Sequence, residues 1–224
     1  MTVPVIAIDG PGGAGKGTVS QMVAQQLGWH LLDSGSLYRI TAYAAGQRGI
    51  ALDDSTAVAQ VARNLDVRFE SAVGGVLVIL QNQDVSAEIR TEEGGRAASV
   101  VAADAAVRAA LIDRQRDFAK PPGLVADGRD MGSVVFSSAG LKIFLTASVQ
   151  ERARRRYKQL KDKGMDVSLP ALSRDMEERD RRDSQRSVAP LRAAEDARVL
   201  DSTDLDVQEV VDLVIFWASE VYSL

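Results

Sequence analysis

The sequence predicts an α/β fold with a five-stranded parallel sheet flanked by helices, a small antiparallel β insertion and a helical lid. Short apolar runs alternate with longer stretches of helical spacing, which is the order typical of βαβ units. The first apolar run leads directly into a glycine-rich loop, as strands do at phosphate-binding sites. A pair of glycines between alternating segments interrupts this order near residue 75 and indicates a hairpin.

Five apolar runs are the candidate strands of the parallel sheet. They are Val3–Asp9, His30–Asp33, Leu124–Asp127, Lys142–Thr146 and Val199–Asp201. Four of them end at an aspartate, and ligands of open α/β sheets collect beyond the carboxyl ends of the strands. We therefore expect functional side chains at these strand ends.

Apolar residues at helical spacing predict six helices. They cover residues 17–28, 35–48, 97–119, 149–163, 168–185 and 206–222. The last has apolar residues at every third or fourth position and is interpreted as a packing helix.

The hairpin segment does not fit a parallel sheet. Two alternating runs flank Gly74-Gly75 within residues 66–89, and a third strand is expected at Asp84–Ile89. We interpret residues 65–90 as a small inserted subdomain, within a single unit that spans residues 1–224.

Composition excludes several classes of chemistry. The chain has 224 residues, with 46% hydrophobic and 26% charged residues, as in an ordinary soluble globular protein. The absence of cysteine excludes disulfides, thiol catalysis and cysteine-based zinc sites. One histidine, His30, cannot form a histidine-based metal site. Any metal is therefore expected to be a hard ion with oxygen ligands, such as Mg²⁺.

Hydropathy and charge bear on location and partners. The sequence shows no membrane span of about 18 apolar residues and no basic leader with a cleavage site, so a cytoplasmic protein is expected. The net charge of −4 argues against binding nucleic acid.

The glycine-rich loop matches the phosphate-binding pattern G-x-x-x-x-G-K. Its residues are Gly10, Pro11, Gly12, Gly13, Ala14, Gly15, Lys16, Gly17 and Thr18. Small residues let backbone N–H groups point at an anion, the helix opening at Lys16 adds its positive end, and Lys16 itself, expected in a solvated crevice, adds a charge. Gly17 occupies the usual Ser/Thr place and the hydroxyl follows at Thr18. This Gly-Lys-Gly-Thr sequence resembles the loop of small nucleoside-monophosphate kinases.

Two further clusters follow predicted strands. Ser34 is expected to cap the helix after Asp33, with Tyr38 and Arg39 one turn further on. Asp127 is placed like the acidic residue that holds Mg²⁺ in P-loop enzymes, and Arg129 would project over the phosphate crevice. A plain Asp-Gly turn is the alternative for this second cluster.

Arginines are dense in residues 152–156 and 179–186. Such helices are commonly solvated faces with pairs of opposite charge. The alternative is a mobile helical lid over residues 149–186 that closes arginines over phosphates, because phosphoryl transfer needs positioning, charge neutralisation and exclusion of water.

Taken together, these motifs resemble bacterial cytidylate kinases over essentially the whole chain. They are the P-loop, Asp33-Ser34-Gly35-x-x-Tyr38-Arg39, Asp127-Gly128-Arg129-Asp130-Met131-Gly132 and Arg179-Asp180-x-x-Asp183-x-x-Arg186. The resemblance implies phosphorylation of CMP and dCMP by ATP with Mg²⁺. It also implies that the insertion at residues 65–90 binds the monophosphate.

The resemblance also implies a role for each matching residue. The P-loop would hold the ATP phosphates, with Thr18 and Asp127 at the metal. Arg39, Arg129 and Arg186 would bind the phosphate of the acceptor, and Ser34 and Tyr38 would shape its pocket. The cytosine would meet Ser99, Arg108 and Asp130, and the pentose would meet Arg179 and Asp183. Lys16, Asp127, Arg129 and Arg186 would be catalytic. Gly94-Gly95 should weaken the helix that carries Ser99.

The chemistry of the base gives an independent argument. A carboxylate and a guanidinium complement the amine and acceptors of cytosine, whereas uracil would set its O4 against Asp130. The alternatives are a kinase acting on AMP or UMP, and a P-loop NTPase that acts as a switch, although no Asn-Lys-x-Asp guanine motif is present. A monomer is expected, because the function needs no second subunit.

Overall fold

A computed structural model describes residues 3–72 and 75–222 of the chain. It divides into two compact units. The core unit comprises Met1–Asp33 and Gln115–Leu224, and the inserted unit comprises Ser34–Arg114.

The core unit contains the predicted parallel sheet. Its strands are β1 (Val5–Asp9), β2 (His30–Asp33), β6 (Leu124–Asp127), β7 (Leu141–Thr146) and β8 (Arg198–Asp201). The order across the sheet is β2-β6-β1-β7-β8, and all four pairings are parallel. All five predicted strands are confirmed, to within two residues at each end. β1 is buried along its whole length, because its apolar run lies in the centre of the sheet.

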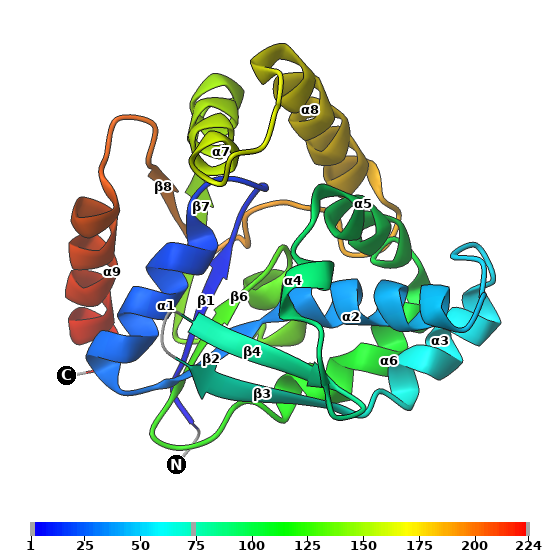
Figure 1. Cartoon of the computed structure of the whole chain (residues 1–224). Coiled ribbons are helices and arrows are strands. Elements are labelled where there is room, and N and C mark those ends of the chain that lie inside the picture. The colour runs from blue at the N-terminus through cyan, green and yellow to red at the C-terminus, as the bar shows by residue number, and fades with distance from the viewer. Residues whose placement is uncertain (1–2, 73–74, 223–224) are drawn as a thin grey trace. The chain divides into compact units, whose positions relative to one another are not determined.

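The core unit has four α-helices and one π-helical turn among its described residues. They are α1 (Lys16–Leu27), η1 (Met131–Val135), α7 (Val149–Asp162), α8 (Leu169–Gln185) and α9 (Val207–Tyr222). Helices α1 and α9 contribute Val19, Val23, Val211 and Val214 to one apolar cluster with the sheet, which includes Ile8. These two helices lie side by side in Figure 1.

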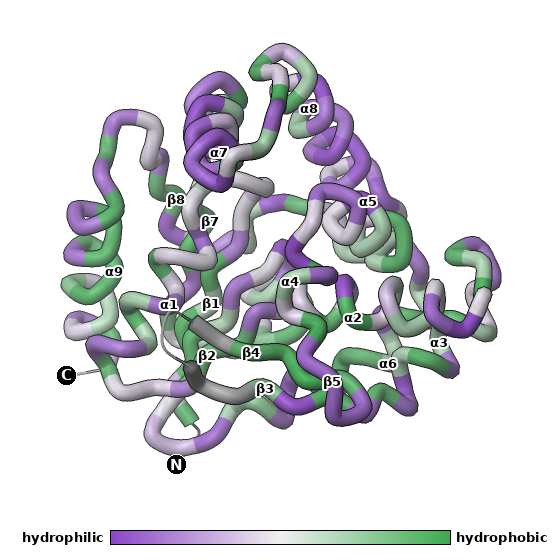
Figure 2. The backbone as a smooth tube through the Cα atoms, in the orientation of Figure 1, coloured by the Kyte–Doolittle hydropathy of each residue, from purple (hydrophilic) through white to green (hydrophobic). Residues whose placement is uncertain are grey.

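Helices α7 and α8 have a different composition. Both are mostly hydrophilic in Figure 2, whereas the sheet strands are mainly apolar. Helix α7 begins after Ser148, whose hydroxyl accepts a hydrogen bond of 3.2 Å from the Glu151 N–H. No described helix is long and apolar enough to cross a membrane.

The inserted unit combines helices with the predicted hairpin. Its elements are α2 (Ser34–Gln47), α3 (Ser55–Arg63), β3 (Val67–Ala72), β4 (Gly75–Leu80), β5 (Gln83–Asp84), α4 (Ser86–Ile89), α5 (Glu92–Val101) and α6 (Ala105–Arg116), the last of which ends in the core unit. Strands β3, β4 and β5 form an antiparallel sheet. The predicted Gly74-Gly75 turn lies partly outside the described residues, and Gly75 already belongs to β4.

Three sequence-based boundaries in the inserted unit are wrong. The third strand ends at Asp84 rather than Ile89, because the Asp84 carboxylate accepts the Ser86 N–H and starts α4. The helix predicted for 97–119 is two helices, since Asp104 accepts the N–H groups of Ala106 and Val107 and begins α6 anew. Helix α2 begins at Ser34 itself, so Ser34 is not the residue before the helix.

Helix α3 was not predicted at all, although its start carries a recognisable signal. The Asp54 side chain accepts a hydrogen bond of 3.0 Å from the Ala57 N–H and caps the helix.

Gly94 occupies a position in α5 that has no room for a side chain. A Cβ added to it would lie 2.7 Å from the carbonyl oxygen of Ile89. Gly94→Ala is expected to lower the free energy of unfolding by roughly 1–3 kcal/mol, because that backbone cannot yield without strain. Gly46→Ala is the matched control: its added Cβ meets no atom within 4 Å, so that variant is expected to gain up to about 1 kcal/mol. Urea unfolding of both variants measures the difference, and equal stability would contradict the steric explanation.

Candidate active site

The P-loop connects β1 to α1 within the core unit. Gly10 has φ 147°, and a Cβ on it would lie 1.9 Å from the carbonyl oxygen of Leu145 in β7. No other residue fits this position. The loop therefore leaves the sheet in a path that only glycine permits, and α1 begins at Lys16 as predicted.

Lys16 is buried rather than solvated, which corrects the sequence-based expectation. The residue is 5% exposed, and its ammonium donates to the Pro11 carbonyl at 2.8 Å. The Asp127 carboxylate lies 4.0 Å away. Burial, and after it the charge of Arg129, lower the pKa of Lys16 to about 7, although the charge of Asp127 acts in the opposite direction. A phosphate beside Lys16 would favour its charged form.

Asp127 ends β6 beside the first turn of α1. Its Oδ2 lies 3.5 Å from the position that a Cβ would take on Gly17, and Thr18 follows as an exposed residue. No group of three or more acidic or histidine side chains in the described ranges could hold a metal ion. The carboxylate of Asp127 and the hydroxyl of Thr18 fit Mg²⁺, because this ion commonly uses one or two protein oxygens and takes its other ligands from phosphates and water.

Charged side chains alternate in sign beside the P-loop. The Arg129 guanidinium donates to the Asp183 carboxylate at 3.1 Å and to the Gly128 carbonyl at 3.2 Å. Arg186 lies 3.8 Å from Asp130. The structure thus brings residues of the turn after β6 together with residues of α8 and its end.

Gly12 marks how close the arginines come to the loop. A Cβ on Gly12 would lie 3.5 Å from terminal nitrogens of both Arg129 and Arg179. Burial would raise the pKa of Asp183, but Arg129, Arg179 and Arg186 together hold it below its usual value. Three guanidinium groups therefore lie around one carboxylate next to the phosphate-binding loop, an arrangement suited to anions.

Asp9 is a buried carboxylate at the end of β1. Its two oxygens accept hydrogen bonds of 2.7 and 2.8 Å from the N–H groups of Met131 and Gly132. Burial raises its pKa to about 6, despite the two hydrogen bonds, which lower it. Sequence analysis placed Asp9 at a strand end without a role, and no local signal could reveal partners more than a hundred residues away.

The arginines of α7 do not act alike. Arg152 is buried and donates to Gly12, to Ala147 and to Asp180, so it ties the P-loop to α8. Arg154 and Arg155 pair with Glu151 and hold its pKa near 2, which is the pattern of opposite charges on a helix face. Whether residues 149–186 move as a lid stays a prediction.

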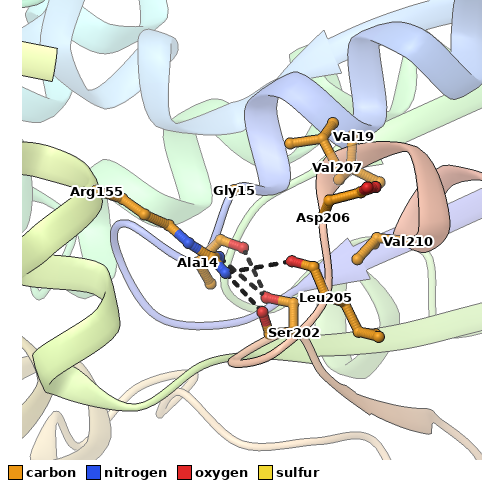
Figure 3. Close-up of a pocket in the computed structure, with 9 residues that line it drawn as sticks. All are labelled: Ala14, Gly15, Val19, Arg155, Ser202, Leu205, Asp206, Val207 and Val210. Carbon is orange, nitrogen blue, oxygen red and sulfur yellow. Dashed lines mark hydrogen bonds between the residues drawn. The ribbon is translucent and has the colours of Figure 1, made fainter. Parts of the chain in front are cut away.

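A small pocket adjoins the P-loop at Ala14 and Gly15 (Figure 3). Its lining combines the start of α1 with the segment after β8: Ala14, Gly15, Val19, Arg155, Ser202, Leu205, Asp206, Val207 and Val210. Arg155 donates to the Ser202 carbonyl at 2.6 Å and so holds α7 against this segment. Sequence analysis expected a functional strand end at Asp201 but did not identify the pocket that follows it.

The inserted unit holds the remaining candidate residues. Arg108 of α6 makes a cation–π contact with Tyr38 of α2, with its guanidinium carbon 5.7 Å from the centre of the ring. Arg108 also donates to the Ala102 carbonyl, and Arg39 donates to the Ile89 carbonyl at 3.0 Å. Ser99 is buried on α5, which packs against the helix of Ser34 and Tyr38.

Comparison with known proteins assigns the family. The family model described as cytidylate kinase matches residues 6–220. The chain belongs to the cytidylate kinase family. A cytidylate kinase from Methylococcus capsulatus is 56% identical over 214 residues, covering 96% of each chain. One from Pseudomonas aeruginosa is 57% identical over 215 residues, covering 95% of this chain and 94% of the relative.

Similarity to solved structures is weaker. A shikimate kinase from Acinetobacter baumannii has 16% identity and a TM-score of 0.47, covering 98% of this chain and 94% of that one. The membership in the cytidylate kinase family therefore comes from the sequence relatives. It agrees with the fold and the family that the motifs predicted.

Proposed function

We propose that this chain transfers the γ-phosphoryl group of ATP directly to CMP and dCMP, giving ADP and the corresponding diphosphate. The observation that carries this proposal is the convergence of Arg129, Arg179 and Arg186 with the P-loop and Lys16 in a chain of this family. Direct transfer needs charge neutralisation and positioning more than covalent chemistry. Clustered guanidinium groups supply both.

The P-loop residues Gly10–Thr18 are proposed to bind the ATP phosphates through backbone N–H groups, with Lys16 as the adjacent cation. The pocket of Figure 3 adjoins this loop and is largely apolar, with Val19, Leu205 and Val207 in its lining. We therefore propose that the nucleoside of ATP packs against these apolar side chains. Mg²⁺ would be held by Asp127 and Thr18, and it would neutralise charge on the transferred phosphates.

The acceptor residues keep the roles that the motifs imply, as proposals. In the core unit, Arg129 and Arg186 would bind the acceptor phosphate, Arg179 and Asp183 the pentose and Asp130 the cytosine amine. In the inserted unit, Arg39 would bind the acceptor phosphate, Ser34 and Tyr38 would shape the acceptor pocket, and Ser99 and Arg108 would bind the base. The pairs Arg129–Asp183 and Arg186–Asp130 would then give way in part to substrate contacts. Catalysis is proposed to rest on Lys16, Asp127, Arg129 and Arg186.

The proposal extends to the location, the oligomeric state and the movement of the protein. We propose that the protein works in the cytoplasm as a monomer, without nucleic acid, and that residues 149–186 close over the bound nucleotides. The net charge of −4 supports the absence of nucleic-acid binding. The ties from Arg152 to Gly12 and Asp180 would allow α8 to respond to occupancy of the P-loop.

A panel of acceptors tests the substrate. CMP and dCMP are expected to give the highest kcat/KM for ADP formation among CMP, dCMP, UMP, AMP and GMP. Preference for AMP or UMP would favour the alternative monophosphate kinases, and ATP hydrolysis independent of every acceptor would favour a P-loop switch.

Asp130 is expected to set base identity. Its carboxylate would accept from the cytosine amine, whereas uracil O4 would meet it as an unfavourable contact worth about 1–3 kcal/mol. Asp130→Asn is therefore expected to lower kcat/KM for CMP far more than for UMP and to narrow their ratio by roughly 5- to 150-fold. Because Asp130 also lies near Arg186, both substrates are expected to lose some activity. If kcat/KM falls by the same factor for CMP and UMP, Asp130 serves only as the ion-pair partner of Arg186.

A further inference from the structure

The turn that carries Arg129 and Asp130 is fastened to β1 at both ends. Before the pair, the Gly128 N–H donates to the carbonyl of Ile8 at 3.1 Å. After it, the N–H groups of Met131 and Gly132 donate to the Asp9 carboxylate. The two proposed substrate-binding residues therefore lie between anchors on two successive residues of the central strand.

The second anchor depends on a property that belongs to a carboxylate. Asp9 uses one oxygen for each N–H, at 2.7 and 2.8 Å, and is only 4% exposed. An amide of the same size offers one acceptor oxygen and an NH₂ group, which would face the second backbone N–H donor. A buried donor left without an acceptor is costly, so the turn would shift to recover a partner.

We propose that Asp9 is a positioning residue for base selection, which aims the Asp130 carboxylate by holding the backbone on its C-terminal side. This inference rests on the proposed function, since it assumes that Asp130 contacts the base. Asp9 itself touches no substrate in this proposal. Its effect reaches the base only through Asp130, by way of the backbone of residues 130–132 and of the repulsion between the two carboxylates.

Asp9 also has an electrostatic influence on Lys16, which a test must separate from positioning. Its negative charge raises the pKa of Lys16. Lys16 would act on ATP, and ATP is the same donor for every acceptor. A change in Lys16 therefore alters the rates with CMP and UMP alike and cancels in their ratio, whereas a misplaced Asp130 carboxylate changes the ratio itself.

A double-mutant cycle tests the proposal. kcat/KM for CMP and UMP is measured for the unmodified chain, Asp9→Asn, Asp130→Asn and the double variant. Asp9→Asn is expected to narrow the CMP-to-UMP ratio at least about fivefold, and the double variant to have about the same ratio as Asp130→Asn alone. The ratio does not depend on the amount of active protein, so partial unfolding does not mimic this result.

Each contrary outcome has its own meaning. If Asp130→Asn narrows the ratio and Asp9→Asn does not, or if the two effects multiply in the double variant, the role of Asp9 is overturned while the assignment of Asp130 stands. If Asp130→Asn itself leaves the ratio unchanged, the base-reading assignment in the proposed function fails and the role of Asp9 fails with it.

Two further variants complete the design. Asp9→Ser keeps one acceptor oxygen, and its hydroxyl hydrogen can rotate away from the backbone donors, so it serves if Asp9→Asn does not fold. It is expected to narrow the ratio in the same direction. Asp54→Asn is the control, because Asp54 also accepts a backbone N–H but caps α3, which carries no proposed site residue. Its activity and its ratio are expected to equal those of the unmodified chain.

Discussion

Lys16→Ala is expected to reduce kcat for CMP phosphorylation by at least about a hundredfold, since preorganised charge in a site closed to water contributes on that scale to the transition state. Lys16 is a buried residue of the P-loop, and its ammonium donates to the Pro11 carbonyl and lies near Asp127. Lys16→Met is the companion variant, because it keeps most of the volume and removes the charge. Both are measured at saturating ATP and CMP.

The same substitution is expected to leave the fold intact. The folded-state pKa of Lys16 lies near 7, below its ordinary value of 10.5, so burial of the charge opposes folding. That cost is fully present below about pH 7 and disappears as the pH rises past 10.5. Lys16→Met is therefore expected to unfold at pH 7 at no lower a temperature than the unmodified chain. Near-normal turnover in either variant would refute the catalytic role of Lys16. Loss of folding would refute the expectation that the substitution affects catalysis alone.

Arg129→Ala is expected to lower kcat/KM for CMP by roughly a hundredfold or more, with changes in both kcat and KM. Its guanidinium lies within reach of the P-loop and donates to Asp183, so it can orient a phosphate and neutralise developing charge. Arg129→Lys is expected to recover little, because an ammonium lacks the planar pair of donors.

The control for Arg129 is an arginine of the same unit with an ion pair of its own. Arg198 pairs with Glu220 at 2.7 Å and stacks on Trp217, and Arg198→Ala is expected to keep full activity. Steady-state kinetics over a range of CMP concentrations separates kcat from KM for each variant. Full activity of Arg129→Lys would show that Arg129 serves as an ion-pair partner of Asp183.

The sheet and the P-loop were predictable because their signals are local. An apolar run such as Val5–Asp9 forms a central strand wherever the chain buries it, and the spacing of glycines before Lys16 specifies one kind of loop. The family followed from four motifs that are each short. The capping residues Asp54 and Asp104 are also local signals. They define the starts of α3 and α6, which the hydrophobic pattern missed.

Tertiary structure alone decided the state of the charged residues. The pKa of Lys16 is set by its burial, by the charges of Arg129 and Arg179, which lower it, and by the charge of Asp127, which raises it. In the sequence, Arg152 is one of several arginines on a charged helix. In the structure it donates to the carbonyl of Gly12 in the P-loop, 140 residues away. Sequence spacing carries no information about such pairs.

By itself, then, the sequence determined the strand order along the chain, the phosphate-binding loop and the family, because backbone propensity and glycine spacing act over a few residues. The tertiary structure decided which carboxylate meets which donor. Asp9 and the N–H groups of Met131 and Gly132 are 122 and 123 residues apart. They meet because β1 pairs with β6, and pairing between distant strands is set by the packing of the whole sheet.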